Sequence, residues 1–520
     1  MTAVLTPPSQ DVTPDRSRAL RALARVEAVK LLRSPITIVA AVLFLAPWIY
    51  GWVSGSINRY PVLHEDAVTV QFLSLLVLGN GALVAANFAA LRAHRHRADA
   101  LFDVLVLPQS WRTGALLVAV LAPTGLAVVL VAVRAGVLAA LPGAAGVVNW
   151  ADLLTGPAVV ALLGTVGVLL ARIVRSAVVA PLVALVLTSC AFIAPVGAAS
   201  EVRWRLLLPI ISPEFPMPVP FELLERPAGR HLLYLVGLIG ALALLALVRS
   251  GARRMWVAGA LTLIVLAGGA ATQFRTDPSV REARLAATND PASVQTCRTV
   301  SDVRYCAFDD FAPWIEDWDA VLRSVRRAVP EVAGPPLAVR QRVLAVGYPE
   351  DGTVVTHEED VARAEAVEQA NVAAGTPEAV PVGTQWGDDK AAAVFAGAVA
   401  YRLITGGSWR SGLPVCGSRG ALLIWLVGQA SERTADGLRE LDETSWNSLV
   451  LGDSSGFSML SVPDADAAAG LALLDKPDAP KVVRQHWDEL IAPGTDANRF
   501  AALVGVPAAP QLPAAERMQC

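Results

Sequence analysis

The chain has 520 residues, of which 54% are hydrophobic and 17% are charged. Soluble domains average nearer ~25% charged residues, so this composition fits a membrane protein better than a soluble one. Residues 1–272 carry 21 Lys and Arg against 12 Asp and Glu, whereas residues 273–520 carry 22 against 34. Two halves of opposite charge predict two domains in different surroundings.

Residues 1–15 are rich in Pro, Ser and Thr, and we expect them to be disordered. From Arg16 to Arg33 apolar residues recur at helical spacing, with six basic residues around them. A basic amphipathic helix before an apolar run is typical of a helix in the cytoplasmic membrane interface. It could serve as a positive anchor alone or also bind a partner. No cleavable signal peptide is expected, because the first 34 residues are polar and Arg-rich.

Seven apolar runs approach the roughly 20 residues that a helix needs to cross a bilayer. They cover residues 36–53, 68–91, 114–133, 153–171, 177–199, 232–248 and 255–272. The last two are short and could instead form one re-entrant pair. With the N-terminus inside, the cytoplasmic segments of this half hold 15 basic residues and the outer loops hold six. This bias follows the positive-inside rule and, with seven spans, places residues 273–520 outside the cell.

The polar residues of these spans also carry information. No span has an ionisable residue in its central part, which argues against the relay that ion pumps and secondary carriers need. Gln71, Asn80 and Asn87 lie along the second span, where they would form interhelical hydrogen bonds or, as the alternative, line a path. The Pro-rich loop 200–230 is expected to be an interfacial or re-entrant hairpin.

The loop between the second and third spans holds the most informative pattern. Four arginines lie in residues 92–112, and Ala98, Leu101, Phe102, Leu105 and Val106 recur at helical spacing between them. Asp99 and Asp103 fall on another face of that helix, and Pro108 ends it. This pattern predicts a short amphipathic helix on the cytoplasmic side, suited to docking a partner. A solvated loop that only sets the topology is the alternative.

These features together resemble the permease subunit of type-2 ABC exporters. The resemblance covers roughly residues 16–250, with an interface helix, a span that follows at once, and the loop ending at Pro108. The interface-helix residues that carry it are Arg25, Glu27, Lys30 and Arg33. In that family the loop after the second span holds a coupling helix that sits in a cleft of the ATPase subunit. Carried over by position, the coupling-helix residues are Arg97, Asp99, Leu101, Phe102, Asp103, Leu105 and Pro108. The family usually has six spans, so the seventh span and the large outer half are additions.

The resemblance implies a set of partners and a location. The chain has no Gly-x-x-x-x-Gly-Lys-Ser/Thr motif, so a separate ATPase subunit would have to supply the energy. The other expected partners are the lipid bilayer and, by resemblance, a second copy or a sister permease; no nucleic acid and no cofactor are expected. Only four of the 43 basic residues are Lys, which we interpret as the mark of a GC-rich bacterial genome. The expected location is the bacterial plasma membrane, with a cytoplasmic N-terminus.

The second half is predicted to be a linker, residues 273–295, and an α-rich α+β extracytoplasmic domain, residues 296–520. Cys297 and Cys306 flank a tight hairpin and are expected to form a disulfide. Cys416 would pair with Cys520 by elimination, and Cys190 would be a free thiol within a span. Strands are predicted at 300–308, 337–348 and 353–356. Helices are predicted at about 312–328, 359–373, 389–405, 419–433, 464–475, 480–491 and 495–504.

No credible catalytic set is found in this half. His357 opens a His-Glu-Glu-Asp run but lacks the second His of a zinc-protease helix, and no serine lies in Gly-x-Ser-x-Gly. We therefore expect neither an enzyme nor a metal site. The rival to a permease is a membrane-anchored extracytoplasmic binding or sensing protein whose membrane region does not transport.

Overall fold

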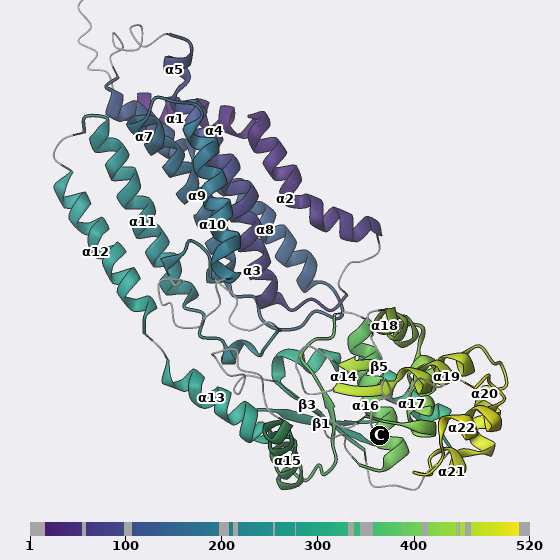
Figure 1. Cartoon of the computed structure of the whole chain (residues 1–520). Helices are drawn as coiled ribbons and strands as arrows, with labels where there is room; N and C mark the ends of the chain where they lie inside the picture. The colour runs from purple at the N-terminus through teal and green to yellow at the C-terminus, as the bar shows by residue number, and fades with distance from the viewer. Residues whose placement is uncertain are drawn as a thin grey trace, which may run out of the picture.

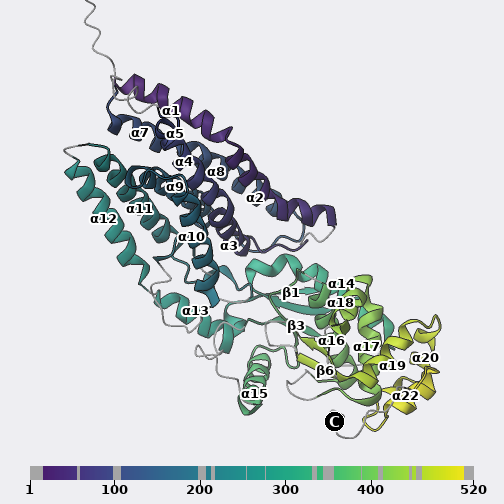
Figure 2. The ribbon, with the colours of Figure 1, turned by 45° about the horizontal axis from the view of Figure 1, so that its top comes forward.

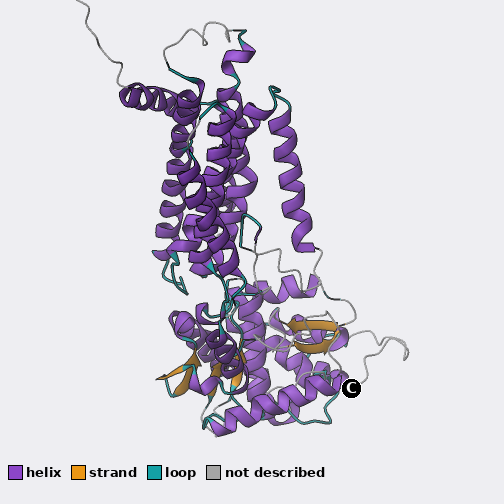
Figure 3. Ribbon diagram, turned by 90° about the vertical axis from the view of Figure 1, so that its left-hand side faces the viewer, coloured by secondary structure: helices purple, strands orange, loops and turns teal. Residues whose placement is uncertain are grey.

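The computed structural model describes residues 16–508 except 55–58, 98–106, 197–206, 212–216, 253–254, 276, 331–336, 344–356, 388, 408–413, 444, 446–447 and 453–458. The chain forms a bundle of long helices and, at one end of it, a smaller domain of helices and short strands (Figures 1 and 3). The mostly helical fold and the small sheet agree with the predicted fold class.

The bundle begins with α1 (Arg16–Leu32), at the end opposite the smaller domain (Figure 1). The long helices that follow are α2 (Pro35–Ser54), α3 (Leu63–Leu73) running through a π-helical turn η1 (Ser74–Gly79) into α4 (Asn80–Ala90), α7 (Gln109–Ala119), α8 (Leu121–Ala139), α9 (Trp150–Ile173), α10 (Val179–Val196), α11 (Ala228–Arg249) and α12 (Trp256–Gln273). Among the described residues, six helices are long and apolar enough to cross a membrane.

The predicted count of seven spans is therefore not confirmed. The predicted fifth span, residues 177–199, coincides with α10, but its apolar helical part over Val179–Cys190 is shorter than the other six. In Figure 1 α10 runs alongside α9 in the bundle. The other six predicted spans each lie largely within one of the six long apolar helices.

Helix α9 forms the centre of the bundle. The most apolar stretch of α9 is 78% buried. The corresponding stretch is 17% buried in α2 and 11% buried in the continuous helical segment Trp256–Asn289, which begins with α12. The side chains that α2 and α12 expose are largely apolar, as expected of helices facing lipid. Helices α9 and α4 approach each other closely, since a Cβ on Gly167 would come within 2.2 Å of the Leu83 carbonyl oxygen. Glycine is thus required there, in keeping with the small residues found at many membrane helix crossings.

The smaller domain, termed the outer domain, contains a four-stranded sheet in the order β1-β2-β3-β4. Strands β1 (Thr296–Val300) and β2 (Val303–Ala307) are antiparallel, and β3 (Ala338–Gln341) and β4 (Val380–Val382) continue the sheet in parallel. Ser301 and Asp302 both have positive φ. They form the type of two-residue turn whose twist best matches that of the two flanking strands. This turn places Cys297 opposite Cys306, and the two form the predicted disulfide.

Helices surround this sheet and a separate hairpin of β5 (Ser448–Gly452) and β6 (Met459–Pro463). They are α13 (Pro278–Asn289), α14 (Ile315–Ala328), α15 (His357–Ala373), α16 (Asp389–Thr405), α17 (Gly417–Ala430), α18 (Glu432–Glu443), α19 (Asp464–Leu474), α20 (Ala479–Gln485), α21 (Trp487–Leu490) and α22 (Ala497–Val504). On α14, Trp318, Leu322 and Val325 are buried in one stripe, with Trp314 directly before it.

Several predictions about this half need correction. The predicted helix 419–433 ends at Ala430 and a new helix, α18, begins at Glu432; β4 and the β5–β6 hairpin were not predicted. The predicted linker 273–295 contains α13. The Asp277 side chain caps the N-terminus of this helix, and Arg284 on the helix donates to the Leu223 carbonyl in a loop of the bundle. The predicted strand 353–356 and Cys520 lie outside the described residues.

Candidate functional site

The first candidate site is the end of the bundle that carries α1, far from the outer domain (Figures 1 and 2). Ala24, Glu27 and Leu31 are buried against the bundle, on the face that the helical spacing predicts. The other three interface-helix residues, Arg25, Lys30 and Arg33, are exposed. The described face of α1 that points away from the bundle is therefore basic and available to lipid or a partner.

Glu27 is the buried polar residue of α1, and its partner lies on another segment. Both carboxylate oxygens of Glu27 accept from Nη1 of Arg92, at 2.8 and 2.9 Å, and Lys30 Nζ lies 3.6 Å away. Arg92 opens the short helix α5 (Arg92–Arg95), which directly follows the second long helix. Because a buried carboxylate needs a partner, this ion pair joins α1 to the segment that leads into the predicted coupling helix. Sequence analysis singled out Glu27 but did not identify Arg92 as its partner.

The predicted coupling helix lies almost wholly outside the described residues. Asp99, Leu101, Phe102, Asp103 and Leu105 belong to the undescribed stretch 98–106, so their arrangement is not described. On its near side Arg95 stacks over the Phe88 ring at 5.0 Å, and Arg97 has a positive φ of 53°. On its far side Pro108 immediately precedes α7, which begins at Gln109. The structure therefore holds the two flanks of this stretch at the α1 end of the bundle.

The three amides of the second long helix all bond to neighbouring segments. Gln71 Nε2 donates to the Asp152 carbonyl at 3.1 Å, and Gln71 Oε1 accepts from the Ile211 N–H at 3.0 Å. Asn80 donates to Thr188 Oγ1 of α10 at 2.8 Å, and Asn87 donates to the Gly167 carbonyl of α9 at 3.1 Å. These contacts agree with interhelical hydrogen bonding, the first of the two predicted roles.

The second candidate site is the junction between the bundle and the outer domain. Tyr60, in the loop before α3, donates its hydroxyl to Asp317 of α14 at 3.0 Å. The Arg433 guanidinium lies 4.6 Å from the Tyr60 ring centre and 5.0 Å from that of Trp386. Arg433 also donates to Asp389 at 2.8 Å. A loop of the bundle is thus held between charged and aromatic groups of the outer domain.

Two further loops of the bundle enter the same junction. The Trp314 indole donates to the Gly143 carbonyl at 2.8 Å, and the Gly146 N–H donates to the Asp310 carbonyl at 2.8 Å. The Asp310 carboxylate accepts from the Phe221 N–H at 2.6 Å. The apolar residues Val62, Ala145, Val219, Leu223 and Leu224 belong to the same buried cluster as the outer-domain core. The described residues 217–226 of the Pro-rich loop therefore pack on protein, unlike the interfacial or re-entrant hairpin expected from sequence.

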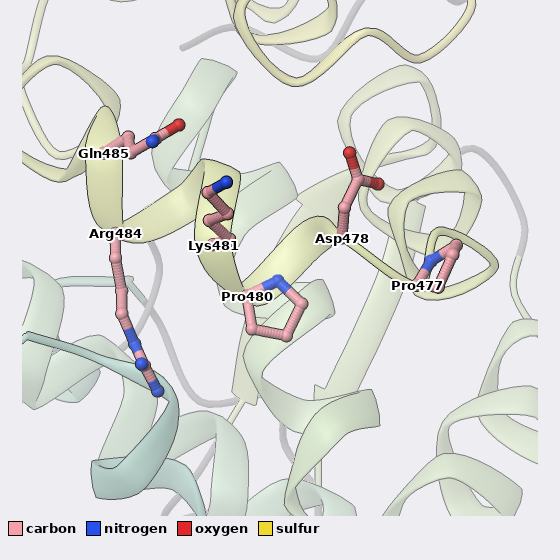
Figure 4. A pocket seen from close by; sticks show the side chains of 6 residues that line it. All are labelled: Pro477, Asp478, Pro480, Lys481, Arg484 and Gln485. Atoms are coloured by element: carbon pink, nitrogen blue, oxygen red, sulfur yellow. The ribbon is translucent and has the colours of Figure 1, made fainter.

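A shallow surface pocket lies on the outer domain, beside α20. The pocket in Figure 4 is a wide, open depression of about 460 Å³ beside α20, bordered by Pro477, Asp478, Pro480, Lys481, Arg484 and Gln485. Its lining side chains diverge rather than converge on one point (Figure 4). Within the described part of the chain, His, Cys, Asp and Glu side chains form no group of three or more that could hold a metal ion.

Comparison with known proteins finds no relative of this chain. No protein-family model matches the chain, and no curated protein or solved structure matches it. The residues and contacts described above are therefore the basis on which a function can be inferred.

Proposed function

We propose that the chain is the membrane-spanning permease subunit of an ABC transporter, an exporter, driven by a separate ATPase subunit. The observation that carries the proposal is the Glu27–Arg92 ion pair at the end of the bundle opposite the outer domain. It joins an exposed basic interface helix to the segment that leads into residues 98–107. A partner that pushes on this segment would thereby also move α1.

The proposal includes a topology of seven spans, with α10 as the fifth. The N-terminus and α1 would face the cytoplasm of a bacterium, and the outer domain would face the opposite side of the plasma membrane. Three loops contact the outer domain, near Tyr60, Gly143 and Phe221, and all would be extracytoplasmic. The excess of basic residues at the α1 end supports this orientation.

The junction also bears on the rival function, a binding or sensing domain on an inert anchor. Such a domain would be expected to fold apart from the membrane loops, as most tethered domains do. Here the loops contribute buried residues to the outer-domain core. This shared core supports a role in which the bundle and the outer domain move together.

The proposal is tested by gentle solubilisation of the tagged chain from its native membrane, followed by identification of co-purifying proteins. We expect an ATPase at near-equal amount, lost in Phe102→Asp, because a charge would disrupt an apolar docking contact. Phe102→Leu, which keeps an apolar side chain, should retain the ATPase. Recovery of an outer-surface protein or ligand in place of an ATPase would support the rival function.

A further inference from the structure

Two buried arginines lie side by side on strand β3 and the residue after it. Arg340 is 1% exposed and Arg342 is 3% exposed. As alternate residues of an extended segment they point to the same face of the sheet. That face is opposite the one on which Tyr305, Val339 and Val380 enter the outer-domain core. We call Arg340 and Arg342 the arginine pair.

The hydrogen bonds of the arginine pair go to neutral acceptors. Arg340 donates to Gln295 Oε1 at 2.8 Å and to Thr376 Oγ1 at 2.9 Å. Arg342 donates to the Val367 carbonyl at 3.2 Å and to Asn371 Oδ1. Within the described part of the chain, neither guanidinium forms an ion pair, and Nε of Arg340 and Nη1 of Arg342 have no hydrogen-bond partner.

Such an arrangement is electrostatically unfavourable without an anion. Burial and the neighbouring Arg340 lower the pKa of the Arg342 guanidinium to about 9. Burial and the nearby Arg304 lower the pKa of Arg340 as well. Glu368 is the acid that acts most on Arg342, but its carboxylate accepts from the Asn371 amide and the Glu378 N–H. Asp290 acts on Arg340 from a distance, and Arg304 itself is exposed. Buried charges in proteins are normally paired, so the two buried guanidiniums, which form no ion pair among the described residues, lack a direct negative partner.

The cover over the arginine pair is thin. It is helix α15, beside α13 at the edge of the outer domain (Figures 1 and 2). Among the α15 side chains whose burial is described, Asn371 alone is buried, and it is the one that bonds to Arg342. Val372, the next residue, is 58% exposed. Two hydrogen bonds from Arg342, to Val367 and Asn371, hold the described part of α15 over the sheet, and Glu368 of α15 accepts a third from the Glu378 N–H.

We propose that the arginine pair is the binding site for a small oxyanion, a phosphate- or carboxylate-bearing molecule, and that α15 is its cover. An oxyanion would accept from Nε of Arg340 and Nη1 of Arg342, the two N–H groups that lack a partner. Guanidinium groups favour this chemistry because their N–H groups match the geometry of carboxylate and phosphate oxygens. The inference does not depend on the proposed transport role.

The test uses the purified full chain in detergent and follows thermal unfolding by tryptophan fluorescence. Inorganic phosphate and citrate are each titrated against chloride at equal ionic strength and pH. We expect at least one of them to raise Tm saturably, by about 2 °C or more. A larger effect of phosphate assigns a phosphate-bearing ligand, and a larger effect of citrate assigns a carboxylate-bearing one.

Two variants and one control locate the effect. Arg340→Gln and Arg342→Gln should each abolish the anion-dependent rise in Tm. Arg298→Gln, an exposed arginine on β1 of the same sheet, should retain it. No saturable rise in the wild-type chain would overturn the proposal, however the variants fold. An equal rise in wild type and both arginine variants would overturn it too.

Discussion

Among single residues, two buried carboxylates, Glu27 and Asp466, join the helices on which they lie to other segments of the chain. Glu27 is neutralised by Arg92, which belongs to a different segment. Asp466, near the start of α19, instead accepts the Gly417 N–H at 2.6 Å, at the first residue of α17. Burial raises the pKa of Asp466 to about 6, although this hydrogen bond offsets part of the effect.

Asp466 predicts a pH-dependent stability. Its pKa is near 3.9 in an unfolded chain, so the folded state binds the proton more tightly. The stabilisation is present below pH ~4 and is lost as pH rises through about 6. Asp466→Asn removes the titration, so its stability relative to wild type should rise by up to about 2 kcal/mol between pH 4 and pH 8.

Thermal unfolding of the full chain at several pH values measures this difference. Asp475→Asn, on an exposed carboxylate directly after α19, serves as the matched control and should show little pH-dependent difference. A stability difference between Asp466→Asn and wild type that stays constant across this pH range would contradict the raised pKa of Asp466.

At the scale of elements, the contact between α4 and α9 organises the bundle. Gly167 allows the two backbones to approach, and Asn87 donates to the Gly167 carbonyl at the same crossing. Without water in the bilayer, helix association depends on such close packing and hydrogen bonds rather than on the hydrophobic effect. A change at this crossing should therefore affect the whole bundle.

Gly167→Ala tests the crossing. Its Cβ would come within 2.2 Å of the Leu83 carbonyl oxygen, so the two helices must separate, at a cost of about 1–3 kcal/mol. We expect a lower Tm of the detergent-solubilised chain. Gly125→Ala on α8, where the added Cβ meets nothing within 4 Å, should leave Tm unchanged or raise it slightly. Equal behaviour of the two variants would show that the crossing is looser than described.

At the scale of the whole molecule, the junction makes the outer domain an extension of the bundle. Three separate loops reach it, and their apolar residues share its core. The proposed seven-span topology then places α1 and the outer domain on opposite sides of the membrane. This placement can be tested without knowledge of the substrate.

Cysteines added one at a time to a Cys190→Ser chain, which lacks the free thiol of α10, test the topology. Arg33→Cys, an exposed position after α1, should react with a membrane-impermeant thiol reagent only after the cells are opened. Arg298→Cys, exposed on β1, should react in intact cells. Labelling of both positions from the same side would contradict the seven-span proposal and favour six crossings.

Features that depend on local pattern could be predicted from the amino-acid sequence. The helical period of residues 16–33 identified the face of α1 that is buried, and the length of the apolar runs identified the long helices. The nine-residue separation of Cys297 and Cys306 across a turn was enough to predict their disulfide. In each case the deciding interactions lie within a few residues or one helix.

Contacts between residues far apart in the chain became visible only in the folded structure. Arg92 neutralises Glu27 across 65 residues, Tyr60 bonds to Asp317 across 257, and Leu223 is buried in the outer-domain core. The same holds for β4, whose three residues form a strand because β3 supplies their partners. Such contacts depend on how whole elements pack, and the local spacing of residue types contains no record of that packing.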